Sequence, residues 1–104
     1  MRLTLEPDVI VVGEAGNGAT ALELAMTLRP DVVVMDVEMP DMDGMVAAAQ
    51  LRTIAPQSAV VIVSMHDDAA TRRRALDAGV ASVIGKYEAA EILPDAIRRA
   101  AAQL

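Results

Sequence analysis

The chain has 104 residues, a formal net charge of −6 at pH 7 and no cysteine. This length predicts one domain spanning residues 1–104, with no room for a separate output domain. The negative charge argues against direct binding to nucleic acid or anionic membranes, which requires clustered Lys and Arg. The absence of cysteine excludes disulfides, thiolate catalysis and cysteine-bound metal centres. No apolar run approaches the roughly 20 residues that cross a bilayer, and the N-terminus lacks the apolar core of a signal peptide, so we expect a cytoplasmic protein.

Apolar runs and segments of helical periodicity alternate along the chain. Four short runs rich in β-branched residues predict buried strands: Val9–Val12, Asp31–Asp36, Ala59–Val63 and Ala81–Gly85. Apolar residues at every third or fourth position predict four helices: Ala19–Leu28, Met45–Thr53, one capped by Asp67 or Asp68 that ends at Gly79, and Glu91–Gln103. Pro94 is tolerable in the last helix because it is expected in the first turn. The alternation predicts an open α/β fold whose parallel strands are joined by right-handed crossovers.

Asp36 is the most informative residue, because it stands at the end of the apolar run that follows Asp31. In open α/β sheets, ligands bind in the crevice outside the carboxyl ends of the strands, which is where this carboxylate would lie. The alternative is that Asp36 caps the next helix. Asp43 is better placed for that role, because it directly precedes Gly44 and the helical segment.

Two further polar residues, Ser64 and Lys86, follow apolar strands in the same way. Each has a simpler explanation on its own, as a turn residue for Ser64 and a solvated charge for Lys86. Together with Asp36 they predict a crevice that holds a carboxylate, a hydroxyl and an ammonium group, a combination suited to phosphoryl transfer onto the carboxylate. Asp36 would be the nucleophile, while Lys86 and Ser64 would stabilise the new anion.

Motifs spread over nearly the whole chain form one signature: Val9–Ala15 with Gly18, Arg29–Asp31, Met35–Gly44, Ser64–Asp68, Ala78–Gly79 and Lys86. With them the chain resembles the receiver domain of bacterial response regulators, of the type usually joined to a helix-turn-helix output domain. The resemblance implies a flavodoxin-like fold and a phosphoprotein that takes part in two-component signal transduction, in a phosphorelay and transcription regulation, and is not an enzyme. It implies that Asp36 accepts a phosphoryl group from a sensor histidine kinase, with Ser64 as switch hydroxyl and Lys86 as phosphate-pairing lysine.

The resemblance also implies a magnesium site at Asp36 and the backbone carbonyl of Glu38, but part of the family pattern is missing. The family has an additional first strand that ends in two acidic, magnesium-binding residues, whereas Met1–Asp8 looks like the end of the helix after that strand. We therefore expect a receiver fold truncated at its N-terminus, without its first strand and most of its first helix. Magnesium usually needs one or two carboxylates besides the phosphate, so the site should be weak or absent and phosphorylation slow or absent.

The missing strand would leave an apolar edge unpaired beside Asp31–Asp36. Such an edge is a template for pairing with another chain, so we expect a homo-oligomer formed through this edge or through the face of the last helix. On the output side, Val83 occupies the position where the family often has an aromatic switch residue, and Tyr87 is expected to be a surface ring. The run Arg72–Arg74 should form a solvated face, because successive helical residues point in different directions.

Other interpretations remain open at this stage. A pseudo-receiver would keep the crevice but act by dimerisation or partner binding, without phosphorylation. A phosphoryl acceptor of the haloacid dehalogenase type is disfavoured, since Glu38 stands where a second Asp is needed and the chain is too short. Met39, Met42 and Met45 would suit copper(I), although packing beneath the crevice explains them better. His66 is expected to tune access to the site rather than to act as a base.

Overall fold

The computed structural model describes residues 13, 15–38, 43–65 and 68–102. Helices and strands alternate through this part of the chain, in the order α1 (Gly18–Leu28), β1 (Val32–Asp36), α2 (Gly44–Ile54), β2 (Ala59–Ser64), α3 (Ala69–Ala78), β3 (Ser82–Gly85) and α4 (Ala89–Ala102). The strand expected at Val9–Val12 lies outside the described residues. None of the helices described is long and apolar enough to cross a membrane.

The three described strands form one parallel sheet in the order β1-β2-β3. Opposite residues in the register include Val34 with Val61 on one side of β2 and Ile62 with Val83 on the other. The chain therefore has the predicted open α/β sheet of the flavodoxin-like class. Because these three strands run the same way, their carboxyl ends meet at one edge of the sheet, where ligands gather in this class of fold.

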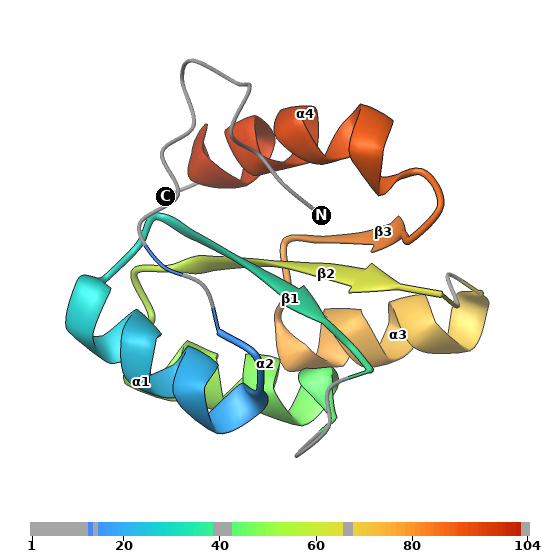
Figure 1. The fold of residues 1–104 in the computed structure, drawn as a ribbon. Helices are drawn as coiled ribbons and strands as arrows, with labels where there is room; N and C mark the ends of the chain where they lie inside the picture. The colour runs from blue at the N-terminus through green and yellow to red at the C-terminus, as the bar shows by residue number, and fades with distance from the viewer. Residues whose placement is uncertain (1–12, 14, 39–42, 66–67, 103–104) are drawn as a thin grey trace.

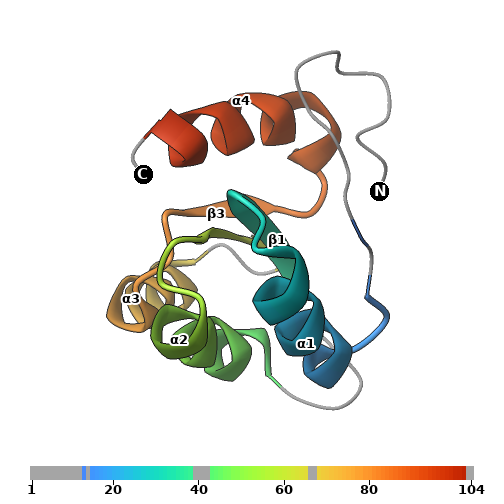
Figure 2. The same cartoon turned by 90° about the vertical axis from the view of Figure 1, so that its left-hand side faces the viewer.

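Helices cover both faces of the sheet (Figures 1 and 2). On one face lie α1, α2 and α3, and their buried side chains pack against Met35 and Ile62. On the other face lies α4, which packs Leu93 against Val61 and Val63. Successive strand residues point to opposite faces, so β2 has to be apolar at nearly every position to serve both cores. This requirement explains the uninterrupted apolar run that predicts the strand.

Short polar residues start the first three helices. The side chains of Asn17, Asp43 and Asp68 accept hydrogen bonds from free backbone N–H groups in the first turns of α1, α2 and α3, respectively. Gly79 ends α3 in the left-handed conformation, with φ of 79°, which a residue without a side chain adopts at no steric cost. The predictions for Asp43, Asp68 and Gly79 are therefore confirmed.

The last helix begins two residues earlier than the sequence predicts. α4 begins at Ala89 rather than Glu91, because the Glu88 carbonyl already accepts hydrogen bonds from the N–H groups of Glu91 and Ile92. Pro94 consequently lies inside the helix and not in its first turn, where its missing N–H would have had no partner anyway. Burial of Leu93 against the sheet holds the helix in place despite the hydrogen bond that the proline removes.

Smaller differences concern single residues at element ends. β1 begins at Val32 rather than Asp31, and β3 begins at Ser82 rather than Ala81. Both predicted residues still take part in backbone pairing, since the Asp31 carbonyl accepts from Ala59 and the Ala81 N–H donates to Val60. Ends of elements fray by a residue or two, so these differences do not move the site.

Candidate functional site

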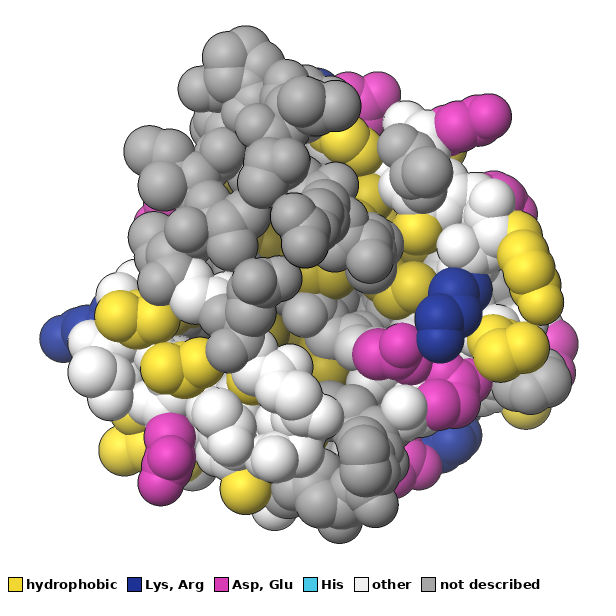
Figure 3. Space-filling model, viewed as in Figure 1, with side chains coloured by type: hydrophobic (Ala, Val, Ile, Leu, Met, Phe, Trp, Pro, Cys, Tyr) yellow, Lys and Arg dark blue, Asp and Glu magenta, His cyan; other side chains and the backbone are white. Residues whose placement is uncertain are grey.

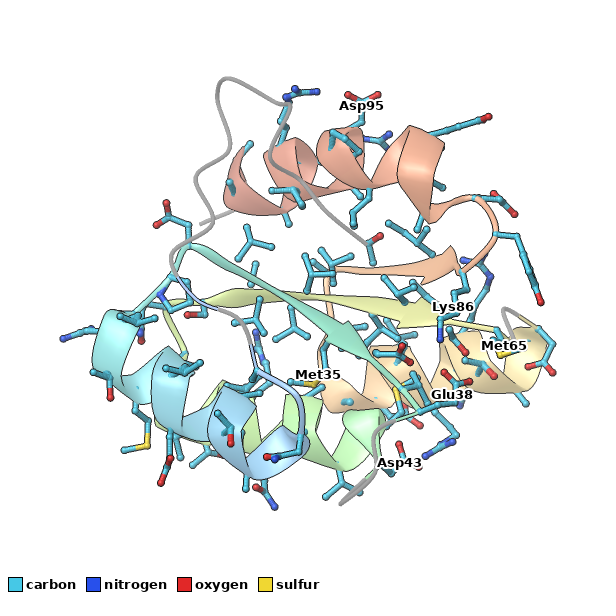
Figure 4. The ribbon with its side chains drawn as sticks, viewed as in Figure 1. Met35, Glu38, Asp43, Met65, Lys86 and Asp95 are labelled. Carbon is cyan, nitrogen blue, oxygen red and sulfur yellow. The ribbon has the colours of Figure 1, made fainter. Side chains whose placement is uncertain are left out.

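Asp36 and Lys86 meet at the carboxyl edge of the sheet. Asp36 is the last residue of β1, Lys86 directly follows β3, and Lys86 Nζ lies 3.0 Å from Asp36 Oδ2. β2 separates the two strands, so their backbones lie about 10 Å apart and only a long side chain spans the end of β2. Figure 4 shows Lys86 pointing toward the end of β1, where Glu38 and Asp43 also lie. Both members of the ion pair remain partly exposed, at 42% for Lys86 and 36% for Asp36, so an incoming group can reach them.

Ser64 stands between these two residues, at the end of β2. Its backbone pairs with Gly85, and its carbonyl accepts a hydrogen bond of 2.7 Å from the N–H of Lys86. The side chain differs from the other two in being only 1% exposed. The structure therefore brings the Asp36 and Lys86 side chains into contact and places Ser64 beside them in the sheet, with its side chain buried.

The Asp36 carboxylate is fixed by local hydrogen bonding. Its Oδ1 accepts a hydrogen bond of 2.9 Å from the N–H of Glu38, the turn that Asp side chains commonly make with a residue two positions on. Asp43, and not Asp36, caps α2, because Asp43 Oδ1 accepts from the N–H of Met45 at 2.7 Å. The alternative interpretation of Asp36 as a helix cap is therefore excluded, and its second oxygen is left for Lys86.

The two charged groups hold each other in their ionised forms. Partial burial raises the pKa of Asp36, but hydrogen bonds from Glu38 and Lys86 together with the Lys86 charge outweigh burial, so the pKa lies below its ordinary 3.8. The hydrogen bond to Asp36 and the charge of this carboxylate raise the pKa of Lys86 above its ordinary 10.5. At neutral pH the site therefore presents an ionised carboxylate beside an ammonium group.

A second ion pair, which the sequence did not predict, lies near the first. Arg74 of α3 places Nη2 2.6 Å from Asp43 Oδ2. Figure 3 shows acidic side chains gathered around basic ones on this face of the molecule. The run Arg72–Arg74 is exposed, as expected, and Arg73 pairs with Asp77 of its own helix. The partner of Arg74 has no local sequence signal, because 31 positions separate the two residues.

The remaining predicted residues have simpler roles or cannot be placed. Met45 is buried in the core beneath β1, which agrees with packing rather than copper binding. Tyr87 is an exposed ring, as expected, and Val83 packs against the core below the sheet. Met39, Met42 and His66 lie outside the described residues.

No magnesium-binding cluster is found in the part of the chain that the structure describes. Within these residues, no three His, Asp, Glu or Cys side chains come close enough to hold a metal ion. Both Asp36 oxygens already accept hydrogen bonds, one from Glu38 and one from Lys86. Magnesium prefers octahedral coordination with one or two carboxylates besides phosphate oxygens, and the described residues do not by themselves meet this demand.

Comparison with known proteins identifies the family of the chain. The model of the family described as "Response regulator receiver domain" matches residues 1–98. The chain belongs to the response regulator receiver family. The response regulator protein VraR of Staphylococcus aureus is 39% identical over 97 residues, which are 93% of this chain but 46% of VraR. This receiver chain thus spans about half the length of the curated relatives it matches.

Solved receiver domains share the fold. The response regulator domain of Thermotoga maritima CheB superposes with a TM-score of 0.83 at 33% identity, covering 93% of this chain and 80% of that one. A LuxR-family two-component response regulator from an Aurantimonas species gives 0.87 at 31% identity, covering 95% and 71%. The receiver domain of the putative regulator NarL from Mycobacterium tuberculosis gives 0.80 at 38% identity, covering 92% and 81%. Receiver domains are components of two-component signalling, so the resemblance to this family found in the sequence is confirmed.

Proposed function

We propose that this receiver accepts a phosphoryl group on Asp36 from a sensor histidine kinase in the cytoplasm, as a step in transcription regulation. The observation that carries the proposal is the 3.0 Å contact between Lys86 Nζ and Asp36 Oδ2 at the carboxyl edge of a parallel sheet. A carboxylate held ionised and partly exposed beside a fixed ammonium group is suited to attack phosphorus. The same contact would be superfluous in a carboxylate that only caps a helix.

In the proposed step, one Asp36 oxygen forms a bond to phosphorus while the bond from phosphorus to the kinase histidine nitrogen breaks. The electron pair of the broken bond stays on the imidazole. Lys86 shifts from the carboxylate to the phosphoryl oxygens, where a charge-assisted hydrogen bond stabilises the added negative charge. The buried Ser64 hydroxyl reaches the phosphoryl group after a change of side-chain rotamer, which gives the family's switch role to this residue.

Magnesium has no assigned part in this step. Asp36 and the Glu38 carbonyl would supply two oxygens at most, and the donors needed to complete the site are not found among the described residues. Without a bound metal ion, Lys86 alone has to offset the repulsion between an anionic phosphoryl donor and the Asp36 carboxylate. We therefore expect slow phosphorylation.

The test is incubation with acetyl phosphate, with and without added magnesium, followed by intact-mass measurement. We expect a gain of one phosphoryl group in the unchanged protein and none in Asp36→Asn. The matched control is Asp31→Asn, which alters an exposed carboxylate directly before the opposite end of β1 and should leave the gain intact.

Absence of any mass gain in the unchanged protein would contradict phosphoryl acceptance. It would favour the second candidate, a pseudo-receiver that binds partners or dimerises without phosphate. Two observations support this candidate. The Asp36–Lys86 pair is formed, but no metal-binding cluster is found beside it among the described residues.

A second copy of the chain is the proposed partner of the β1 edge. In the described residues, β1 pairs with β2 on one side and with no strand on the other. Unpaired backbone groups along an apolar strand favour edge pairing. The alternative contact is the α4 face, where Ile92 is exposed. Sedimentation velocity over micromolar concentrations should show association, and a single monomeric species throughout would exclude it.

A further inference from the structure

Arg74 connects α3 to the start of α2 through one side chain. Its Nη2 lies 2.6 Å from Asp43 Oδ2, while Asp43 Oδ1 accepts the N–H of Met45 at 2.7 Å. One carboxylate thus serves two partners, a helix that it caps and a cation from a different helix. Charge-assisted hydrogen bonds of this kind fix the orientation of a carboxylate more strongly than a cap alone.

Asp43 in turn belongs to a set of backbone contacts around Asp36, here called the acceptor turn and made of the described residues Asp36–Glu38 and Asp43–Gly44. The Gly44 N–H donates to the Val37 carbonyl at 3.0 Å, and Glu38 forms an antiparallel bridge with Asp43. Gly44 also packs directly on the end of β1, since a Cβ added there would lie 2.6 Å from the Asp36 carbonyl oxygen. Asp43 and Gly44 therefore contact the backbone that directly follows Asp36, and we expect a displacement of Asp43 to reach it.

We propose that Arg74 is a positioning residue for the phosphoryl-accepting site, which holds the acceptor turn against the end of β1 by its ion pair with Asp43. Its effect on phosphorylation rests on the proposed function above. The Arg74–Asp43 ion pair, here called the tether, does not depend on that function, because it exists in the protein without phosphate.

Charge explains why the acceptor turn needs this contact. The acceptor turn carries acidic residues at Asp36, Glu38 and Asp43, and Lys86 pairs with Asp36. Arg74 pairs with Asp43, and its hydrogen bond keeps the pKa of Asp43 below the ordinary value. Removal of Arg74 would leave Asp43 without its cationic partner and would remove the contact that ties the start of α2 to α3.

The expected effect is modest because water reaches the pair. The side chains of Arg74 and Asp43 are 53% and 39% exposed, and exposed ion pairs change an equilibrium by about threefold rather than a hundredfold. Arg73 provides a matched control on the same helix. It is exposed and pairs with Asp77 of α3, so its loss leaves the acceptor turn untouched.

The first arm of the test measures amide hydrogen exchange by NMR in the unphosphorylated protein. In Arg74→Ala we expect the amides of Gly44 and Met45 to exchange about threefold faster, since their hydrogen bonds to Val37 and Asp43 depend on the tether. Arg74→Lys should restore part of the protection, and Arg73→Ala should leave both rates unchanged. Unchanged exchange in Arg74→Ala, or an equal change in Arg73→Ala, would overturn the proposal.

The second arm measures the initial rate of phosphorylation by acetyl phosphate. We expect Arg74→Ala to react about threefold more slowly, and to have no further effect in the Asp43→Asn background, where the side-chain amide still caps α2 but lacks the charge. An equal effect of Arg74→Ala in both backgrounds would show that Arg74 acts elsewhere. If the unchanged protein gains no phosphoryl group, the proposed function fails. The exchange measurement still decides whether Arg74 holds the acceptor turn in place.

Discussion

The middle strand and the rim of the sheet differ in what holds them together. β2 is buried from Val60 to Ser64 and packs apolar side chains into the cores on both faces. At the rim, where the strands end, Asp36 and Lys86 are partly exposed charges that pair with each other. The difference indicates that β2 supplies most of the stability and the charges at the rim little of it, because burial of apolar surface contributes far more than exposed ion pairs. The rim charges are those assigned to the proposed phosphoryl transfer. Substitutions should therefore separate the two properties.

The largest expected effect is on the stability of the middle strand. Ile62→Ala empties a fully buried position beneath the sheet and should lower the free energy of unfolding by about 3 kcal/mol. Urea denaturation monitored by circular dichroism measures this loss. Val46→Ala, at a half-exposed position on α2, is the control and should change stability by less than about 0.5 kcal/mol. If both variants lost a similar amount of unfolding free energy, the claim that β2 supplies most of the stability would be wrong.

A smaller effect is expected where the two regions touch. Gly44→Ala would place a Cβ 2.6 Å from the Asp36 carbonyl oxygen and 2.7 Å from Val37 Cα, both of them backbone atoms. Relief of this overlap requires a shift of the acceptor turn, so stability should fall by about 2 kcal/mol and phosphorylation of Asp36 should slow.

Gly16→Ala is the matched control for that substitution, because nothing lies within 4 Å of a Cβ added there. It should leave the phosphorylation rate unchanged. If Gly44→Ala reacted as fast as the unchanged protein, the link between the turn and the acceptor site would be disproved.

The smallest expected effect is the pH dependence of the rim. The pKa values of Asp36 and Asp43 lie below their ordinary 3.8, so both carboxylates stabilise the folded state above that value. This stability is lost as the pH falls through the lower folded-state pKa values. Exposure limits the loss to less than about 1 kcal/mol, measurable as a shift of the urea midpoint between neutral pH and pH below 3.8.

The variant carrying Asp36→Asn and Asp43→Asn should lack this part of the acid sensitivity. Equal acid sensitivity in the variant and the unchanged protein would mean that other carboxylates cause the loss. Such a result would contradict the assignment of the two ion pairs to the rim.

The contact between Asp36 and Lys86 was predictable because its causes are general. Apolar runs mark the strands, parallel strands end at the same edge, and a polar residue directly after each run must lie at that edge. The same reasoning placed Ser64 at the rim. It did not predict that the Ser64 side chain is 1% exposed, because burial depends on which elements cover the end of β2.

Arg74 and α4 show where prediction failed. Arg74 looks like any exposed helical cation, and its contact with Asp43 depends on how α2 and α3 pack side by side. The start of α4 was misplaced by two residues because Pro94 suggested a first turn. In the structure, packing of Leu93 and Ile97 against the sheet outweighs the lost backbone hydrogen bond.

The sequence by itself determined the order and type of the described elements, the helix caps and the edge at which Asp36 and Lys86 lie. These features follow from hydrophobic periodicity and from side chains that bond to backbone a few residues away, so they are local. Tertiary structure alone decided which charges pair across helices, how deeply Ser64 is buried and where α4 begins. Those outcomes depend on contacts between residues far apart in the chain, which become neighbours only when the helices pack on the sheet.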